Sequence, residues 1–172
     1  MSDSLAELSA QVVHQLIDRG LTIACAESLT GGLLCATLID TAGASNCVRG
    51  GACTYATDTK ASVLHVDSHH LARKGPVDPD TATMMAEGVA ELYQSDWALS
   101  TTGVAGPGPA DGYEAGTVYI GWCDRLTGQS HAWKYLFAGD RSTIRKETVR
   151  HALRLVRGLL ADGGIDDDAR VR

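Results

Sequence analysis

The chain has 172 residues, of which 44% are hydrophobic and 21% are charged. This balance is typical of one globular domain and excludes an intrinsically disordered chain. The formal net charge of −6 argues against a nucleic-acid backbone or an anionic membrane as the partner, because both attract an excess of lysine and arginine.

The first part of the chain predicts a helix, a strand and a second helix. Apolar residues recur at helical spacing over 5–17, and Gly20 can end this helix. Residues 21–26 are apolar and β-prone, and a new helical pattern runs over 30–40. We therefore expect Ser28 in a tight turn between a strand and a helix.

The next segments continue this alternation. Residues 48–55 predict a second strand, and residues 57–65 predict a short helix that contains Lys60. Asp78 and Pro79 form a favourable helix start, because Asp is a good N-cap and Pro suits the first helical position.

The last part of the chain predicts strands and one long helix. Residues 97–101 predict a third strand, which leads into a loop over 102–109 that is rich in Gly and Pro. Two further β-prone segments, 117–123 and 131–137, flank a turn and predict a hairpin. A final amphipathic helix is expected over 142–160.

These elements predict an α/β fold. Because strands alternate with helices except at one hairpin, we expect a three-layer α/β/α sandwich with a mixed β-sheet. No linker or repeat divides the chain, which predicts one domain over 1–165. An acidic tail over 166–172 is expected to be disordered.

Cysteine usage and hydropathy predict a cytoplasmic protein. The five cysteines are odd in number and include no CxxC pair, which favours free buried thiols over a disulfide frame or a zinc site. No apolar run approaches the roughly 20 residues of a membrane span. The first residues lack the basic and apolar regions of a signal peptide.

Ser28 is the first candidate for chemistry. Its turn lies where α/β proteins usually bind ligands, and the helix that follows offers free backbone N–H groups. We expect Thr30, Gly31 and Gly32 to be substrate-binding residues, because Thr30 belongs to the same turn and the two glycines would let a ligand approach these N–H groups closely. The alternative interpretation is that Ser28 or Thr30 is an ordinary N-cap.

Lys60 is the candidate base for a serine nucleophile. Serine–lysine pairs can replace the Ser–His–Asp arrangement, provided that burial or a neighbouring cation lowers the lysine pKa. Tyr55 could hydrogen-bond the lysine or relay a proton. The alternative for Lys60 is a solvated surface lysine.

The glycine-rich loop and the start of the last helix could bind a ligand. The loop contains Thr102 and Gly103, whose exposed amides could hold an anionic or carbonyl group, although an ordinary surface loop is an equal alternative. Arg141 lies at the predicted helix start, where it could reach a phosphate.

Two further clusters have simpler interpretations. His65 and His69 have the spacing of metal ligands on one helix face, but Asp67 indicates a helix break or a helix cap between them, so we expect no metal site. The basic residues of the last helix could face nucleic acid, yet a solvated helix side fits the negative net charge better.

Taken together, these segments resemble the CinA C-terminal domain family, from about residue 5 to 160. The resemblance rests on five motifs in the same order: Ala26-Glu27-Ser28-Leu29-Thr30-Gly31-Gly32, Tyr55 with Lys60, Thr102-Gly103-Val104-Ala105-Gly106-Pro107, Gly116-Thr117-Val118, and Phe137-Ala138-Gly139-Asp140-Arg141. Each motif is moderately specific, and the ordered set is highly specific.

The resemblance implies a function. Stand-alone members of this family are nicotinamide-nucleotide amidases, which hydrolyse the carboxamide of nicotinamide mononucleotide (NMN) to nicotinate mononucleotide and ammonia without a metal or another cofactor. It implies that Ser28 is the nucleophile, Lys60 its base and Tyr55 an assisting hydroxyl. Thr102 and Arg141 match positions associated with the active site.

The chain departs from the family pattern at two places. The tyrosine is usually followed by Ser-Asn, where this chain has Ala56 and Thr57, and Glu114 replaces a usual proline. The alternatives to an NMN amidase are an amidase for another carboxamide and a non-catalytic binding module linked to competence or DNA damage. A homodimer is expected from the frequency of symmetric association among small enzymes.

Overall fold

A computed structural model describes residues 3–162. One mixed sheet has the strand order β2-β1-β3-β4-β5. Strand β1 pairs in parallel with β2 and β3, whereas β4 runs antiparallel to both β3 and β5. The bounds are Ile23–Glu27 for β1, Val48–Cys53 for β2, Trp97–Gly103 for β3, Thr117–Asp124 for β4 and Gln129–Leu136 for β5.

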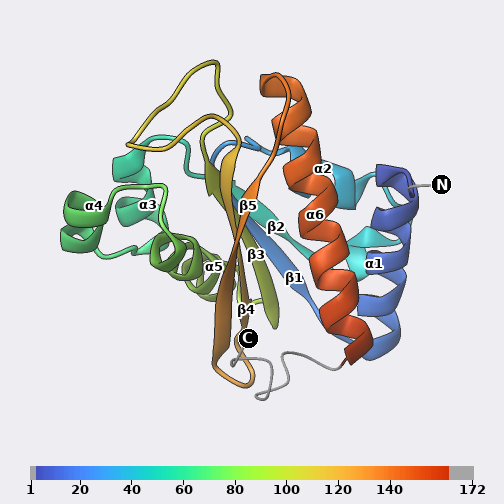
Figure 1. Cartoon of the computed structure of the whole chain (residues 1–172). Helices are drawn as coiled ribbons and strands as arrows, with labels where there is room; N and C mark the ends of the chain where they lie inside the picture. The colour runs from blue at the N-terminus through green and yellow to red at the C-terminus, as the bar shows by residue number, and fades with distance from the viewer. Residues whose placement is uncertain (1–2, 163–172) are drawn as a thin grey trace.

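Helices cover both faces of this sheet (Figure 1). One face carries α1 (Leu5–Arg19), α2 (Leu33–Ile39) and α6 (Arg141–Asp162). On the other face α5 (Pro79–Tyr93) lies against the strands, and α3 (Thr57–Leu64) and α4 (Ser68–Lys74) pack outside it. A short 3₁₀ turn, η1, spans Ala44–Asn46. The prediction of a three-layer α/β/α sandwich with a mixed sheet is confirmed.

Local capping explains where several helices begin and end. Ser4 and Glu7 form a reciprocal capping box at the start of α1, and Gly20 ends that helix in the left-handed conformation. Asp78 caps α5 as expected. Helix α4 was not predicted as an element, but Asp67, which was expected to be a helix break or cap, caps it by accepting the backbone N–H of His70.

Strand β1 lies inside the core between β2 and β3. It is buried along its whole length, as expected for a strand covered on both faces. Ile23 and Cys25 pack with the apolar cluster under α1, α2 and α6, whereas Ala24 and Ala26 pack with the cluster under α5. The end of this strand therefore carries the next residues to a fixed position.

The cysteines are all free, but their burial differs from the prediction. Cys25, Cys47 and Cys123 are buried, Cys35 is half-buried and Cys53 is exposed. Cys53 is exposed because it ends β2, which is an edge strand.

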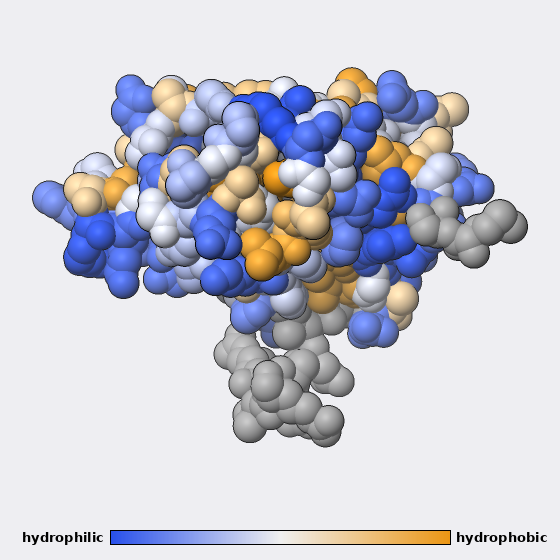
Figure 2. Space-filling view, turned by 45° about the horizontal axis from the view of Figure 1, so that its top comes forward, coloured by the Kyte–Doolittle hydropathy of each residue, from blue (hydrophilic) through white to orange (hydrophobic). Residues whose placement is uncertain are grey.

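The surface and the helix lengths bear on two other expectations. In the space-filling view, apolar residues form small patches within a largely hydrophilic surface (Figure 2). Within residues 3–162, no helix is both long enough and apolar enough to cross a bilayer. The predicted disordered tail over 166–172 lies outside the described residues.

Candidate active site

Ser28 lies in the turn that follows β1. Its backbone N–H continues the sheet by donating to the carbonyl of Thr101 at 2.9 Å. Gly31 and Gly32 adopt φ values of 56° and 97°, which glycine reaches without strain. Gly32 is the N-cap of α2. The alternative interpretation, in which Ser28 or Thr30 caps this helix through its hydroxyl, is therefore wrong.

The start of α2 is capped by Glu27, a residue whose role was not predicted. Its buried carboxylate accepts backbone N–H groups from three residues, at 3.1 Å from Gly32, 2.9 Å from Leu34 and 2.8 Å from Cys35. Gly31 donates its own N–H to the carbonyl of Ser28 at 3.1 Å. This corrects the expectation that the amides of Gly31 and Gly32 face a ligand, because both already have partners in the protein.

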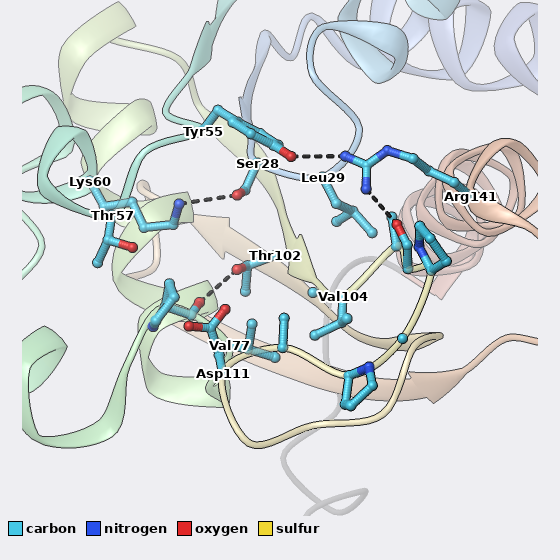
Figure 3. A pocket seen from close by; sticks show the side chains of 18 residues that line it. Ser28, Leu29, Tyr55, Thr57, Lys60, Val77, Thr102, Val104, Asp111 and Arg141 are labelled. Atoms are coloured by element: carbon cyan, nitrogen blue, oxygen red, sulfur yellow. Dashed lines mark hydrogen bonds between the residues drawn. The ribbon is translucent and has the colours of Figure 1, made fainter.

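Lys60 lies beside Ser28 (Figure 3). The two side chains are joined by a hydrogen bond of 3.1 Å between Lys60 Nζ and Ser28 Oγ, and Nζ also donates to the carbonyl of Thr54 at 2.6 Å. The lysine is fully buried. Burial lowers its pKa from the usual 10.5 to about 8, because a charged ammonium is disfavoured away from water. The alternative of a solvated surface lysine is wrong.

The sheet explains how two residues distant in sequence meet. Glu27 is paired with Cys53 across β1 and β2, and the backbone N–H of Thr54 donates to the carbonyl of Glu27 at 2.9 Å. The chain therefore leaves both parallel strands at the same edge. Helix α3 begins immediately afterwards, and its first turns bring Lys60 back over the end of β1.

A cavity of about 260 Å³ opens in front of the serine–lysine pair. Arg141, at the start of α6, closes one side by donating to the carbonyl of Gly106 at 2.7 Å and to the Tyr55 hydroxyl at 2.8 Å. Both arginine and tyrosine line the cavity with Ser28 and Lys60 (Figure 3). The Tyr55 hydroxyl is thus held by Arg141, and within residues 3–162 it makes no hydrogen bond to the lysine.

The remaining predicted residues divide into two groups. Thr102 and Gly103 line the cavity, and the Thr102 hydroxyl donates to the carbonyl of Pro76 at 2.6 Å. Thr30 is fully buried, and its hydroxyl shares a hydrogen bond of 2.6 Å with that of Thr101. Thr30, Gly31 and Gly32 lie behind Ser28 and do not line this cavity.

Asp111 is a cavity residue that sequence analysis missed. It is exposed on the loop between β3 and β4, adopts a φ of 52°, and lines the cavity opposite the pair. Its negative charge raises the pKa of Lys60, against the stronger lowering effect of burial. The neighbouring Gly112 indicates a turn at this position, but nothing in the sequence places it near the lysine.

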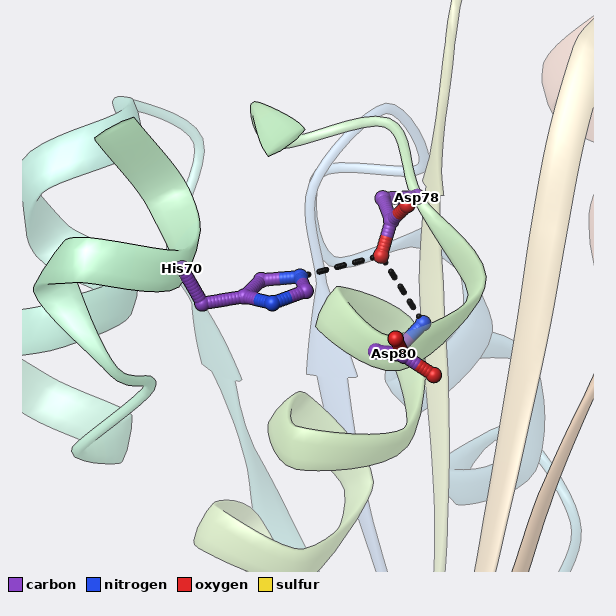
Figure 4. Close-up of side chains that lie close together, drawn as sticks. All are labelled: His70, Asp78 and Asp80. Carbon is purple, nitrogen blue, oxygen red and sulfur yellow. Dashed lines mark hydrogen bonds and ion pairs between the residues drawn. The ribbon is translucent and has the colours of Figure 1, made fainter. Parts of the chain in front are cut away.

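A histidine and two aspartates form a second cluster, outside the cavity (Figure 4). The ligand atoms of His70, Asp78 and Asp80 all lie within 4.8 Å of one another. However, one oxygen of Asp78 already accepts His70 Nε2 at 3.0 Å and the backbone N–H of Asp80 at 3.0 Å. The cluster therefore links α4 to the start of α5. The predicted pair of His65 and His69 does not share a helix face, because His65 ends α3 and His69 belongs to α4.

The fold and the site define an α/β protein with a buried serine–lysine pair at the carboxyl end of a mixed sheet. The family model of the CinA C-terminal domain matches residues 5–160, and the chain belongs to this family.

Relatives with known sequences or structures agree with this assignment. A CinA-like protein of Frankia casuarinae is 44% identical over 154 residues, which cover 90% of this chain and 35% of that protein. The chain spans about a third of the length of the curated relatives that it matches. A CinA superfamily protein of Klebsiella pneumoniae superposes with a TM-score of 0.89 at 34% identity, covering 93% of this chain and 99% of the other. One from Escherichia coli gives 0.85 at 31% identity, covering 92% and 90%.

Proposed function

We propose that this chain is a serine amidohydrolase that converts NMN to nicotinate mononucleotide and ammonia. The observation that carries the proposal is the hydrogen bond of 3.1 Å between Lys60 and Ser28, made by a fully buried lysine whose pKa falls to about 8. A lysine with this pKa is partly neutral near pH 7 and can act as a general base.

The proposed mechanism resembles that of Ser-His-Asp hydrolases, with lysine in place of histidine as the general base and general acid. Neutral Lys60 takes the hydroxyl proton of Ser28 while Oγ forms a bond to the carboxamide carbon, and the carbonyl electron pair moves to oxygen. The electron pair returns, the carbon–nitrogen bond breaks, and Lys60 gives its proton to the departing ammonia. Water then attacks the acyl-serine, again losing a proton to Lys60, and the carboxylic acid leaves as Ser28 recovers its proton.

The choice of NMN rests on the family resemblance, and two features of the cavity support it. Its volume of about 260 Å³ suits a small molecule. The guanidinium of Arg141 lies on its wall, and guanidinium groups bind phosphate well. A different small carboxamide would use the same pair, so substrate choice depends on the cavity walls.

The test is an ammonia-release assay on NMN with matched variants. Ser28→Ala and Lys60→Met should each lower kcat by about 10³-fold or more, since the nucleophile and its base act as a unit. Ser45→Ala and Lys74→Met, which alter exposed residues that do not line the cavity, should keep the wild-type rate. If the wild type releases no ammonia, or if Ser28→Ala retains its rate, the proposal is overturned.

The alternative of a nucleic-acid face on α6 has less support, because four of its arginines donate to other parts of the protein, Arg141 among them. Arg145 donates to backbone carbonyls near Ser28, and Arg150 and Arg157 both donate to Asp3. Salt-dependent retention of DNA in a filter-binding titration would favour this alternative.

A further inference from the structure

Arg145 connects α6 to the turn that carries the nucleophile. It is half-buried on the first turns of that helix, one turn beyond Arg141. Its Nε donates to the carbonyl of Leu29 at 2.9 Å, and its terminal nitrogen donates to the carbonyl of Thr30 at 2.8 Å. One guanidinium therefore holds two successive carbonyls immediately after Ser28, a geometry that its planar fork allows.

These contacts fix the orientation of two peptide groups. The carbonyl of Ser28 accepts the N–H of Gly31, and the carbonyl of Leu29 accepts Arg145. In a trans peptide the C=O and N–H bonds point in opposite directions. The N–H groups of Leu29 and Thr30 therefore point away from Gly31 and Arg145.

These two N–H groups have no hydrogen-bond partner within the described part of the chain. Leu29 and Thr30 are both buried, yet neither backbone N–H donates to any residue within 3–162. Buried backbone donors without a partner are rare and costly, so two in succession beside a candidate nucleophile call for a function. Of the two residues, Leu29 lines the cavity next to Ser28, whereas Thr30 does not.

We propose that the N–H group of Leu29 is an oxyanion donor of this enzyme and that Arg145 is the residue that holds the turn carrying it in position. The proposal rests on the proposed amidase function and extends it. As the bond from Ser28 Oγ to the carboxamide carbon forms, the carbonyl electron pair moves to oxygen, and the N–H group of Leu29 donates to that oxygen. Serine hydrolases of other folds use the amide after the nucleophile in this way.

Arg145 acts on this donor through the backbone of the turn. By holding the carbonyls of Leu29 and Thr30, it fixes the segment that carries the Leu29 N–H group beside Ser28. A lysine at this position would keep the charge but could not hold two carbonyls with one planar group. The arginine is therefore expected to act on the transition state and to leave the binding of the substrate nearly unchanged.

The test compares Arg145→Gln and Arg145→Lys with Arg150→Gln as the matched control. Arg150 lies on the same helix but donates to Asp3 and Glu147, away from the cavity. On NMN, Arg145→Gln should lower kcat by about 100-fold, the usual loss when an oxyanion donor is removed, with KM within about threefold. Arg145→Lys should recover part of this loss, and Arg150→Gln should match the wild type.

A second probe separates this inference from the identity of the substrate. Acylation of Ser28 by p-nitrophenyl acetate also passes through an oxyanion. It is monitored by the release of nitrophenol and by the mass of the intact protein. If the wild type is acylated by the ester but does not hydrolyse NMN, and Arg145→Gln slows acylation about 100-fold, the oxyanion hole stands and the substrate assignment falls. If neither probe acylates Ser28, both proposals fall.

Three results would overturn the role of Arg145 alone. The first is a rate for Arg145→Gln equal to that of Arg150→Gln on both probes. The second is a rise in KM at unchanged kcat, which would indicate that the arginine contributes to substrate binding. The third is a folded Arg145→Lys variant with wild-type kcat, and this variant provides the test if Arg145→Gln lowers the melting temperature.

Discussion

The pKa of Lys60 predicts how the reaction depends on pH. With a pKa of about 8, roughly 10% of the lysine is neutral at pH 7 and about half at pH 8. Only the neutral amine can take the proton of Ser28, so kcat/KM on NMN should rise about tenfold per pH unit below pH 7 and level off above about pH 9.

Asp111→Asn perturbs this titration without touching the pair. The carboxylate stabilises the ammonium form and raises the pKa of Lys60, so its removal should shift the rising limb to lower pH. At pH 7 the variant should be faster than the wild type, by at most about tenfold, because the rate cannot exceed that of fully neutral lysine. Glu114→Gln is the matched control, since it removes the same charge from the same exposed loop and Glu114 does not perturb the lysine.

The measurement is the pH profile of kcat/KM for the three proteins between pH 6 and about pH 10, a range that brackets the lysine pKa. A flat profile, or a limb that ends well below pH 7, would show that Lys60 is not the base. A shift of the limb to higher pH in Asp111→Asn, or an equal shift in Glu114→Gln, would refute the electrostatic reasoning.

Three further predictions concern stability, measured by urea unfolding. Lys60→Met should stabilise the fold by up to about 3 kcal/mol at pH 7, because folding lowers the lysine pKa from 10.5 to about 8 and so disfavours the charged ammonium. This gain should shrink as the pH rises from about 8 to 10.5, because the wild-type lysine then loses its proton and no longer buries a charge. Glu27→Gln should cost about 2–3 kcal/mol, since the amide cannot accept all three N–H groups that cap α2, whereas Glu7→Gln at the exposed cap of α1 should cost much less. Gly88→Ala should cost more than about 2 kcal/mol, because a methyl group on α5 would collide with the backbone carbonyl of Leu64 on α3; an unchanged midpoint would contradict this packing.

Local patterns in the sequence predict most elements of the fold. The strand that ends before Ser28, the helix that contains Lys60 and the start of α5 at Asp78 all follow from hydrophobic periodicity and capping residues. Helix α4 escapes prediction because it has only seven residues and its cap, Asp67, also suits a simple turn.

Contacts between distant segments are harder to predict. The pairing of Ser28 with Lys60 depends on β1 and β2 being neighbours in the sheet, which no local pattern specifies. The family resemblance suggests that pair. It suggests neither the capping of α2 by Glu27 nor the hydrogen bonds from Arg145 to the turn. The pattern around Glu27 predicts only that it ends a strand, and Arg145 is one of several basic residues on a predicted solvated helix. Their contacts with α2 and with the turn exist only in the tertiary fold.

The two walls of the cavity differ in how firmly they are built into the fold. Ser28 extends a central, fully buried strand, whereas residues 107–112 form an exposed loop outside the sheet. In native-state hydrogen exchange, the amide of Ser28 should open only with global unfolding, and the loop amides should exchange through local fluctuations. Under the proposed amidase function, evolution can therefore reshape the loop to admit different carboxamides while the serine stays in place, so differences in substrate choice among relatives should concentrate in this loop.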